Sequence, residues 1–267
     1  MKCYVSALYI YPIKSCRGVA VQAARATLRG LEGDRLMMVV DEDGHMLTQR
    51  ELPRMALIAP RLVGDQVCLD APDMPPLWFT PRLQGASQPV AIWNTTCLGV
   101  DQGQAVSEWL SAYLGQPARL VHVAENAHRA TRLGNGEVAF ADSYPYLVVG
   151  QASLDDLSAR LGTPVPAERF RPNVVIAGGA PFDEDQWREV QIGDARLELV
   201  KPCSRCSVVE IAENDPLEST HPARGVLAAL AAYRQREGKV FFGQNAVLRR
   251  EGIVRVGDAV EVLTRRT

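Results

Sequence analysis

Short runs in which apolar and polar residues alternate are the dominant pattern of this chain, and they predict a mainly β protein. Tyr4–Ile10, Val174–Ala177 and Ala195–Val200 are runs of this kind. Ser207–Ile211 is rich in β-branched residues and predicts a further strand. Many short strands joined by turns are typical of barrel-like sheets, so we expect barrel-like closure.

Turn sequences between neighbouring runs predict hairpins. Leu36–Val40 and Met46–Gln49 flank a segment that ends in Asp-Gly. Arg61–Val63 and Gln66–Leu69 flank a Gly-Asp pair. Both dipeptides supply the backbone conformations that tight turns between antiparallel strands require.

Three segments have the period of amphipathic helices. Ala105–Leu114 carries an apolar stripe and is followed by a glycine, which is a common helix stop. Ser153 is placed to cap a helix that runs to Leu161, and Pro222–Glu237 carries another apolar stripe. With these helices added, the fold class is mainly β with a few helices (α+β).

Length and composition then limit the possibilities. A chain of 267 residues exceeds a typical single domain, so we expect one large or two closely joined domains, with a junction near residue 120 that separates residues 1–120 from residues 121–267. The polar segment Ala124–Gly136 lies beside that junction and predicts a loop. A hydrophobic content of 47% supports a packed core. A net charge of −2 does not indicate binding of nucleic acid.

Three features of the sequence predict where the protein is located. The N-terminus has no signal-peptide core, and the longest apolar stretches are shorter than a membrane span. Only two of the six cysteines are closely spaced, which fits a reducing compartment better than a disulfide scaffold. We therefore expect a cytoplasmic protein that does not bind a membrane.

The hexapeptide Lys201–Cys206 carries the strongest chemical signal. Cys203 and Cys206 flank an arginine and follow a lysine, surroundings that are typical of reactive cysteines. A structural zinc site needs four ligands, and a single C-x-x-C supplies two. A thioredoxin-like pair should open a helix, whereas β-branched residues follow here. Inert buried cysteines are a third reading, which the charged setting disfavours for at least one of the two.

Polar residues beside other predicted strands could bind an anion. Lys14 and Ser15 lie in the loop after the first strand, and Arg35 precedes the second. A lysine, a hydroxyl and an arginine in such places are suitable donors for a phosphate. Arg171 and Asn173 open a later strand and offer donors for a phosphate or the edge of a heterocycle. Any one of these residues alone is more often a solvated or structurally paired group.

The order and spacing of five motifs resemble one family. The motifs are Tyr-Pro-Ile-Lys-Ser-Cys-Arg-Gly at 11–18, Gly-Asp-Arg at 33–35, Phe-Arg-Pro-Asn at 170–173, Lys-Pro-Cys-Ser-Arg-Cys at 201–206 and Phe-Gly-Gln-Asn at 242–245. From Tyr4 to Leu263 the chain resembles MOSC-domain proteins, named after the C-terminal domain of molybdenum cofactor sulfurase. In these proteins a MOSC-type β-barrel often follows a β-rich N-terminal domain. The resemblance is strongest to the mitochondrial amidoxime-reducing component and its bacterial relatives.

The resemblance implies a molybdenum cofactor that is held through a cysteine. Cys206 matches the residue that ligates molybdenum, and Ser204 and Arg205 then lie against the cofactor. Asp142 and Ser143 belong to a further segment that matches the family near the site. Asp142 is our candidate catalytic group, by position only.

The same resemblance implies how the pterin part of the cofactor is bound. Lys14, Ser15 and Arg35 match residues that bind its phosphate. Arg171 and Asn173 match residues that contact the pterin itself. These roles agree with the donor chemistry of the side chains, since cations and hydroxyls suit a phosphate and planar donors suit a ring system.

The activity implied by the resemblance is reduction of small N-hydroxylated compounds, from N–OH to N–H. Many bacterial relatives carry a C-terminal plant-type ferredoxin domain, whose cluster needs four cysteines. No cysteine follows Cys206 in this sequence, so we expect no iron–sulfur cluster in this chain and a separate electron donor, either a ferredoxin or a flavoprotein reductase. The alternative is a carrier that holds a persulfide on Cys206 or Cys203, or that stores the molybdenum cofactor without turnover.

Overall fold

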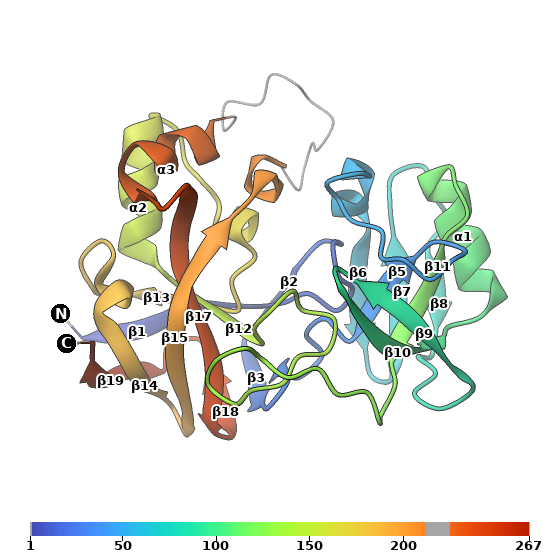
Figure 1. The fold of residues 1–267 in the computed structure, drawn as a ribbon, viewed down its shortest axis with the longest axis horizontal. Helices are drawn as coiled ribbons and strands as arrows, with labels where there is room; N and C mark the ends of the chain where they lie inside the picture. The colour runs from blue at the N-terminus through green and yellow to red at the C-terminus, as the bar shows by residue number, and fades with distance from the viewer. Residues whose placement is uncertain (1, 212–224, 267) are drawn as a thin grey trace.

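Strands are the main regular structure of the molecule, as the alternating pattern predicted. The computed structural model describes residues 2–211 and 225–266. Within this part the fold is mainly β with a few helices and contains a closed sheet, so the predicted fold class is confirmed (Figure 1). No helix in the described ranges is long and apolar enough to cross a membrane.

The largest sheet closes into a barrel. In barrel order its strands are β12 (Tyr146–Gly150), β13 (Val174–Ala177), β1 (Cys3–Ile10), β19 (Ala259–Arg265), β14 (Trp187–Ile192), β15 (Ala195–Arg205) and β17 (Lys239–Arg250). The barrel closes because β17 also pairs with β12, with Tyr146 opposite Ala246. Two short strands extend it, β2 (Val19–Val21) beside β1 and β16 (Gln235–Arg236) beside β17. Closure leaves few free strand edges in this sheet.

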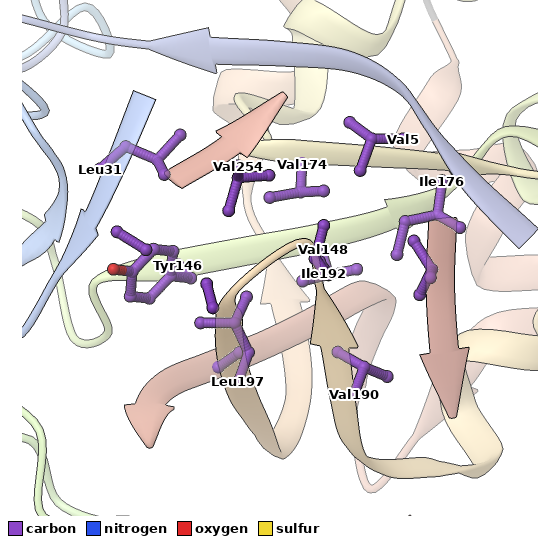
Figure 2. Packing of buried hydrophobic residues seen from close by; sticks show 14 of the residues in the cluster. Val5, Leu31, Tyr146, Val148, Val174, Ile176, Val190, Ile192, Leu197 and Val254 are labelled. Atoms are coloured by element: carbon purple, nitrogen blue, oxygen red, sulfur yellow. The ribbon is translucent and has the colours of Figure 1, made fainter. Parts of the chain in front are cut away.

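The inward-facing residues of the barrel strands form one apolar core. Figure 2 shows Val5, Val148, Val174, Ile192 and Leu197 converging from five different strands. Each of these side chains is almost fully buried. Burial of one such side chain stabilises the fold by about 1.5–3 kcal/mol, so this core supplies a rigid frame for the loops at the barrel rim.

The remaining sheets are formed mainly by the first half of the chain. One has the order β5 (Met37–Val40), β11 (Arg119–Val123), β10 (Thr95–Asp101) and β9 (Ser87–Ile92). A second contains β6 (Ala59–Val63), β7 (Gln66–Asp70) and β8 (Leu77–Phe79), and a third contains β18 (Gly252–Arg255), β3 (Ala23–Thr27) and β4 (Gly30–Leu31). In Figure 1 the first two lie on the opposite side of the molecule from the barrel. The chain order interleaves with this arrangement, because β1 belongs to the barrel, and the boundary at residue 120 stays a prediction.

The helices agree with the sequence pattern in position and differ at their ends. α1 (Gln104–Leu114) buries the predicted apolar stripe and ends at Gly115, whose φ is 72°. α2 (Gln151–Leu161) begins before Ser153, so Ser153 does not cap it. The Ser153 hydroxyl instead donates to the buried carboxylate of Glu184, at 2.8 Å.

α3 (Val226–Arg234) is shorter than the predicted helix, and residues 222–224 of that prediction lie outside the described residues. The short 3-10 helices are η1 (Pro53–Leu57), η2 (Ala167–Phe170), η3 (Asp183–Gln186) and η4 (Ser207–Glu210).

The predicted strand at Ser207–Ile211 is wrong, since Ser207–Glu210 form η4 and Ile211 follows it. Its β-branched residues favour a strand locally, but tertiary contacts decide the outcome. Val209 is fully buried in an apolar cluster, and the Glu210 carboxylate accepts the backbone N–H groups of Gly225 and Leu227 at the start of α3. A carboxylate in this place satisfies free helix amides and favours the turn.

The predicted hairpins had different outcomes. β6 and β7 form one, with Val63 opposite Gln66. After β5 the expected turn is present. Its two sides are joined by a single antiparallel bridge between Val40 and Met46. Residues 46–49 do not continue as a strand and lead instead to the pocket described below.

A substitution at Gly243 in β17 tests how tightly the barrel wall is packed beside that pocket. Its φ is 75°, and an added Cβ would lie 2.8 Å from Val149 Cγ2 and 2.9 Å from the Val148 carbonyl oxygen. We expect Gly243→Ala to lower the free energy of unfolding by about 2–4 kcal/mol, measured by urea denaturation. Gly238→Ala is the control, because Gly238 also has positive φ but open space around it, so the cost should be about 1 kcal/mol. Equal losses in the two variants would contradict this packing argument.

Candidate functional site

One pocket is lined by every residue that the sequence assigned to the site. Its volume is about 390 Å³. The ten residues are Lys14, Ser15, Arg35, Asp142, Ser143, Arg171, Asn173, Ser204, Arg205 and Cys206. They come from well-separated parts of the chain, around β1, β5, β12, β13 and β15. Folding therefore brings these residues together in one pocket, and their individual roles stay predictions.

A buried cation lies at one end of the site. Lys14 is only 6% exposed, and its ammonium group forms an ion pair with Asp142. Burial lowers the pKa of Lys14, and the Asp142 carboxylate opposes that shift. Burial by itself would raise the pKa of Asp142, but the charge and hydrogen bond of Lys14 and the indole of Trp93 together hold it well below its usual range. Asp142 is therefore an ionised ion-pair partner in this arrangement, and its catalytic role stays a prediction.

Arg35 is the centre of a network of fixed planar donors. Its Nη1 donates to Asp34 at 2.5 Å and lies 3.4 Å from the Asn173 side-chain oxygen, and its Nη2 donates to the Arg171 carbonyl at 3.1 Å. The guanidinium carbons of Arg35 and Arg171 lie 4.6 Å and 4.2 Å from the centroid of the Tyr11 ring. Cation–π contacts of this kind are attractive, so one buried ring orients two arginines of the pocket.

Strained backbone is concentrated in the same place. Ser15, Arg35 and Arg171 have φ values of 66°, 51° and 55°. Residues other than glycine rarely adopt this left-handed conformation, and each costs about 1–3 kcal/mol unless the surroundings enforce it. Clusters of such residues are typical of ligand sites, which supports the same candidate site independently of the motifs.

The two cysteines have different surroundings. Cys206 follows β15 and is exposed, and its sulfur accepts a hydrogen bond from Arg50 Nη2 at 3.1 Å. Cys203 lies within β15 and is half-buried, and its sulfur accepts from Arg205 Nη1 at 3.0 Å. Arg205 also donates to the Phe170 carbonyl, at 2.8 Å. Cys203 therefore helps to orient Arg205, while Cys206 presents its sulfur to the pocket.

A zinc site has no support in this geometry. All six cysteines are free, and residues 2–211 and 225–266 contain no group of three or more His, Cys, Asp or Glu side chains that could hold a metal ion. A soft metal bound at Cys206 would need its other ligands from elsewhere, such as a cofactor or solvent.

Sequence reasoning missed the residues that the segment after β5 and the β9–β10 turn add to the pocket. Arg50 and Trp93 line it, together with Thr48 and Gln49. Trp93 has a signal in the sequence, because it occupies a two-residue turn between the alternating runs of β9 and β10, where glycine is normal. Arg50 has no such signal, since only folding brings it to Cys206.

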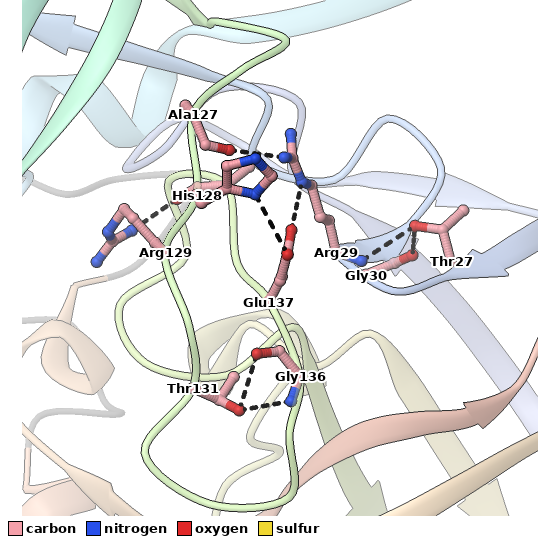
Figure 3. A network of polar contacts seen from close by, with 10 residues as sticks. Thr27, Arg29, Gly30, Ala127, His128, Arg129, Thr131, Gly136 and Glu137 are labelled. Atoms are coloured by element: carbon pink, nitrogen blue, oxygen red, sulfur yellow. Dashed lines mark hydrogen bonds and ion pairs between the residues drawn. The ribbon is translucent and has the colours of Figure 1, made fainter.

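The polar segment after β11 is held by specific contacts. Arg129 Nη1 donates to the carbonyls of Ala139 and Ala141, at 2.6 and 3.1 Å, just before Asp142. Arg29 donates to the Ala127 carbonyl at 2.6 Å and to the Glu137 carboxylate at 3.2 Å (Figure 3). These contacts position the segment that carries Asp142 and Ser143.

Comparisons with known proteins identify the family of the chain. Residues 2–117 match the MOSC N-terminal beta barrel domain, and residues 135–261 match the MOSC domain. The human mitochondrial amidoxime-reducing component 1 is 36% identical, with 97% of this chain and 82% of that protein covered. The Xenopus laevis component 1 is 33% identical over 98% of this chain and 82% of that protein, and the human component 2 is 34% identical over 96% and 82%. The chain therefore belongs to the MOSC-domain family that includes the mitochondrial amidoxime-reducing components.

Proposed function

We propose that the protein is a molybdenum-cofactor-dependent oxidoreductase that reduces N-hydroxylated compounds. The name of its relatives describes the reduction of amidoximes, which are compounds of this class. The observation that carries the proposal is the pocket in which the exposed thiol of Cys206, the buried cation of Lys14 and the arginine network meet.

The residues of the pocket fit the parts of that cofactor. Cys206 would hold the molybdenum through its soft sulfur. Lys14, Ser15 and Arg35 would bind the terminal phosphate, whose charge needs buried cations and fixed donors. The Nε of Arg205 is buried without a hydrogen-bond partner among the described residues, although Arg205 lines the pocket, so a bound group would give it one.

The rest of the pocket offers donors for the ring system. Arg171 and Asn173 would contact the pterin edge, and Ser143 and Ser204 are exposed hydroxyls on the same surface. When bound, the cofactor supplies the two-electron chemistry that, with two protons, converts N–OH to N–H and water. The residues that line the pocket would orient the cofactor, and they would orient the substrate beside the exposed Cys206.

The electrons would come from a separate protein, a ferredoxin or a flavoprotein reductase. Within this sequence no cysteine follows Cys206, so a plant-type cluster has no ligands there. Six free thiols suit a reducing compartment, and we propose the cytoplasm.

A carrier function is the second candidate. The exposure of Cys206 favours it, because a persulfide must be reached by an acceptor. A purified persulfide carrier would release sulfide when reduced and would contain no molybdenum, so metal analysis separates it from the reductase. A carrier that stores the molybdenum cofactor would contain the metal and would show no turnover of an amidoxime.

The two cysteines should respond differently to substitution. We expect Cys206→Ser to abolish amidoxime reduction and molybdenum binding without loss of fold, since the side chain is exposed and a hydroxyl is a poor ligand for a soft metal. Cys203→Ser should retain most of both, because Cys203 contacts Arg205 and has no proposed ligand role. Activity, metal content and melting temperature are measured together, and equal effects of the two changes would contradict the assignment of Cys206.

Lys14→Gln tests the phosphate end. Loss of one charge-assisted contact, worth roughly 1.5–3 kcal/mol, should lower cofactor affinity about tenfold or more. Lys14 suits the test better than Arg35, whose removal would leave the buried carboxylate of Asp34 unpaired. Lys239→Gln, an exposed lysine outside the pocket, is the control. Unchanged pterin content in Lys14→Gln would count against a phosphate at this place.

The source of electrons is tested by supplying donors one at a time. The sequence contains neither a G-x-G-x-x-G fingerprint nor a Walker-type loop, so NADH or NADPH alone should not support amine formation from a model amidoxime. A reduced ferredoxin, a flavoprotein reductase system or an artificial low-potential donor should restore it. Turnover with NADH alone, in protein free of other reductases, would show that this view of electron supply is wrong.

A further inference from the structure

Trp93 connects the two ends of the pocket through the two parts of its side chain. Its indole N–H donates to Asp142 at 2.9 Å, and Asp142 pairs with the buried ammonium of Lys14. The guanidinium carbon of Arg50 lies 4.6 Å from the Trp93 ring centroid, and Arg50 donates to the sulfur of Cys206 at 3.1 Å. One side chain from the β9–β10 turn thus contacts the partners of both Lys14 and Cys206.

The turn that carries Trp93 does not itself call for a tryptophan. Ile92 pairs with Thr95, so the loop has two residues, and the φ of Trp93 is 52°. The turns that suit such hairpins require positive φ at the first loop residue, where glycine, asparagine and aspartate are normal. A bulky residue there is strained, and Trp93 remains 48% exposed, so neither turn geometry nor core packing explains it. Departures from local rules of this kind are typical of functional positions.

We propose that Trp93 is a positioning residue of the cofactor site, whose ring holds Arg50 against the Cys206 sulfur and whose N–H holds Asp142 against Lys14. The contacts of Trp93 are observed in the structure, whereas their role in cofactor binding rests on the proposed function. The sheet that carries the β9–β10 turn would then contribute directly to the site instead of only supporting it.

The contact with Arg50 is tested in protein without cofactor, in a Cys203→Ser background. Iodoacetate is an anion and iodoacetamide is neutral, so the ratio of their rates at Cys206 reports the nearby positive charge and is independent of how much of the thiol is ionised. We expect Trp93→Leu to lower this ratio about threefold, as loss of one ordered charge a few ångströms away implies. Trp93→Phe keeps a ring face and should keep the ratio. Alkylation is located by peptide mass spectrometry.

The control is Trp78→Leu. Trp78 lies on β8, is 45% exposed and also carries an arginine, Arg61, at 5.6 Å from its ring centroid, but it does not line the pocket. Its loss should leave the ratio unchanged. If Trp93→Leu fails to fold, Trp93→Gly, which suits the positive φ, replaces it. A ratio that is the same in the wild type and in the variant lacking the ring would overturn the ring contact.

The contact with Asp142 is tested by cofactor retention. Trp93→Phe lacks the N–H, so we expect the loaded variant to lose pterin roughly tenfold faster than the wild type during gel filtration at low protein concentration, and Trp93→Leu to lose it faster still. Equal retention in all three would overturn the positioning role. If the wild type takes up neither molybdenum nor pterin, the proposed function fails, and the alkylation ratios still decide whether Trp93 positions Arg50.

Discussion

The buried charge of Lys14 is the constraint on which the site depends. An ammonium group removed from water is costly unless it is paired, and here Asp142 is its partner. Asp142 in turn is held by Trp93 from the β9–β10 turn, and the segment before it is held by Arg129. An ammonium group has three hydrogens, so Lys14 can pair with Asp142 and still donate to a ligand phosphate, together with Ser15 and Arg35 in the same pocket.

The barrel provides the rigidity that this arrangement needs. Pairing of β12 with β17 closes the sheet and brings the loops around β1, β13 and β15 to one rim. The left-handed residues Ser15, Arg35 and Arg171 lie on or beside these loops, where packing can enforce an unfavourable backbone. The stable core and the strained site are therefore parts of the same arrangement, since strain persists only where the surroundings determine it.

Local patterns predicted what depends on local chemistry. The alternating runs predicted three of the seven barrel strands, β1, β13 and β15, and the stripe with its terminal glycine predicted α1 almost to the residue. Ser207–Ile211 was mispredicted because burial of Val209 and the contact of Glu210 with α3 are tertiary effects. Ser153 was mispredicted as a cap because its partner, Glu184, is distant in sequence. The motifs named residues that line one pocket, whereas Arg50 and Trp93 were missed because their contacts cross between sheets.

The most direct test of the account is the metal and pterin content of the wild-type protein, produced in a host that synthesises molybdenum cofactor. If Cys206, Lys14 and the arginine network form a cofactor site, molybdenum and pterin should both be present in stoichiometric amounts after purification. Protein that is correctly folded but contains neither, while releasing sulfide on reduction, would contradict the account and favour a sulfur carrier.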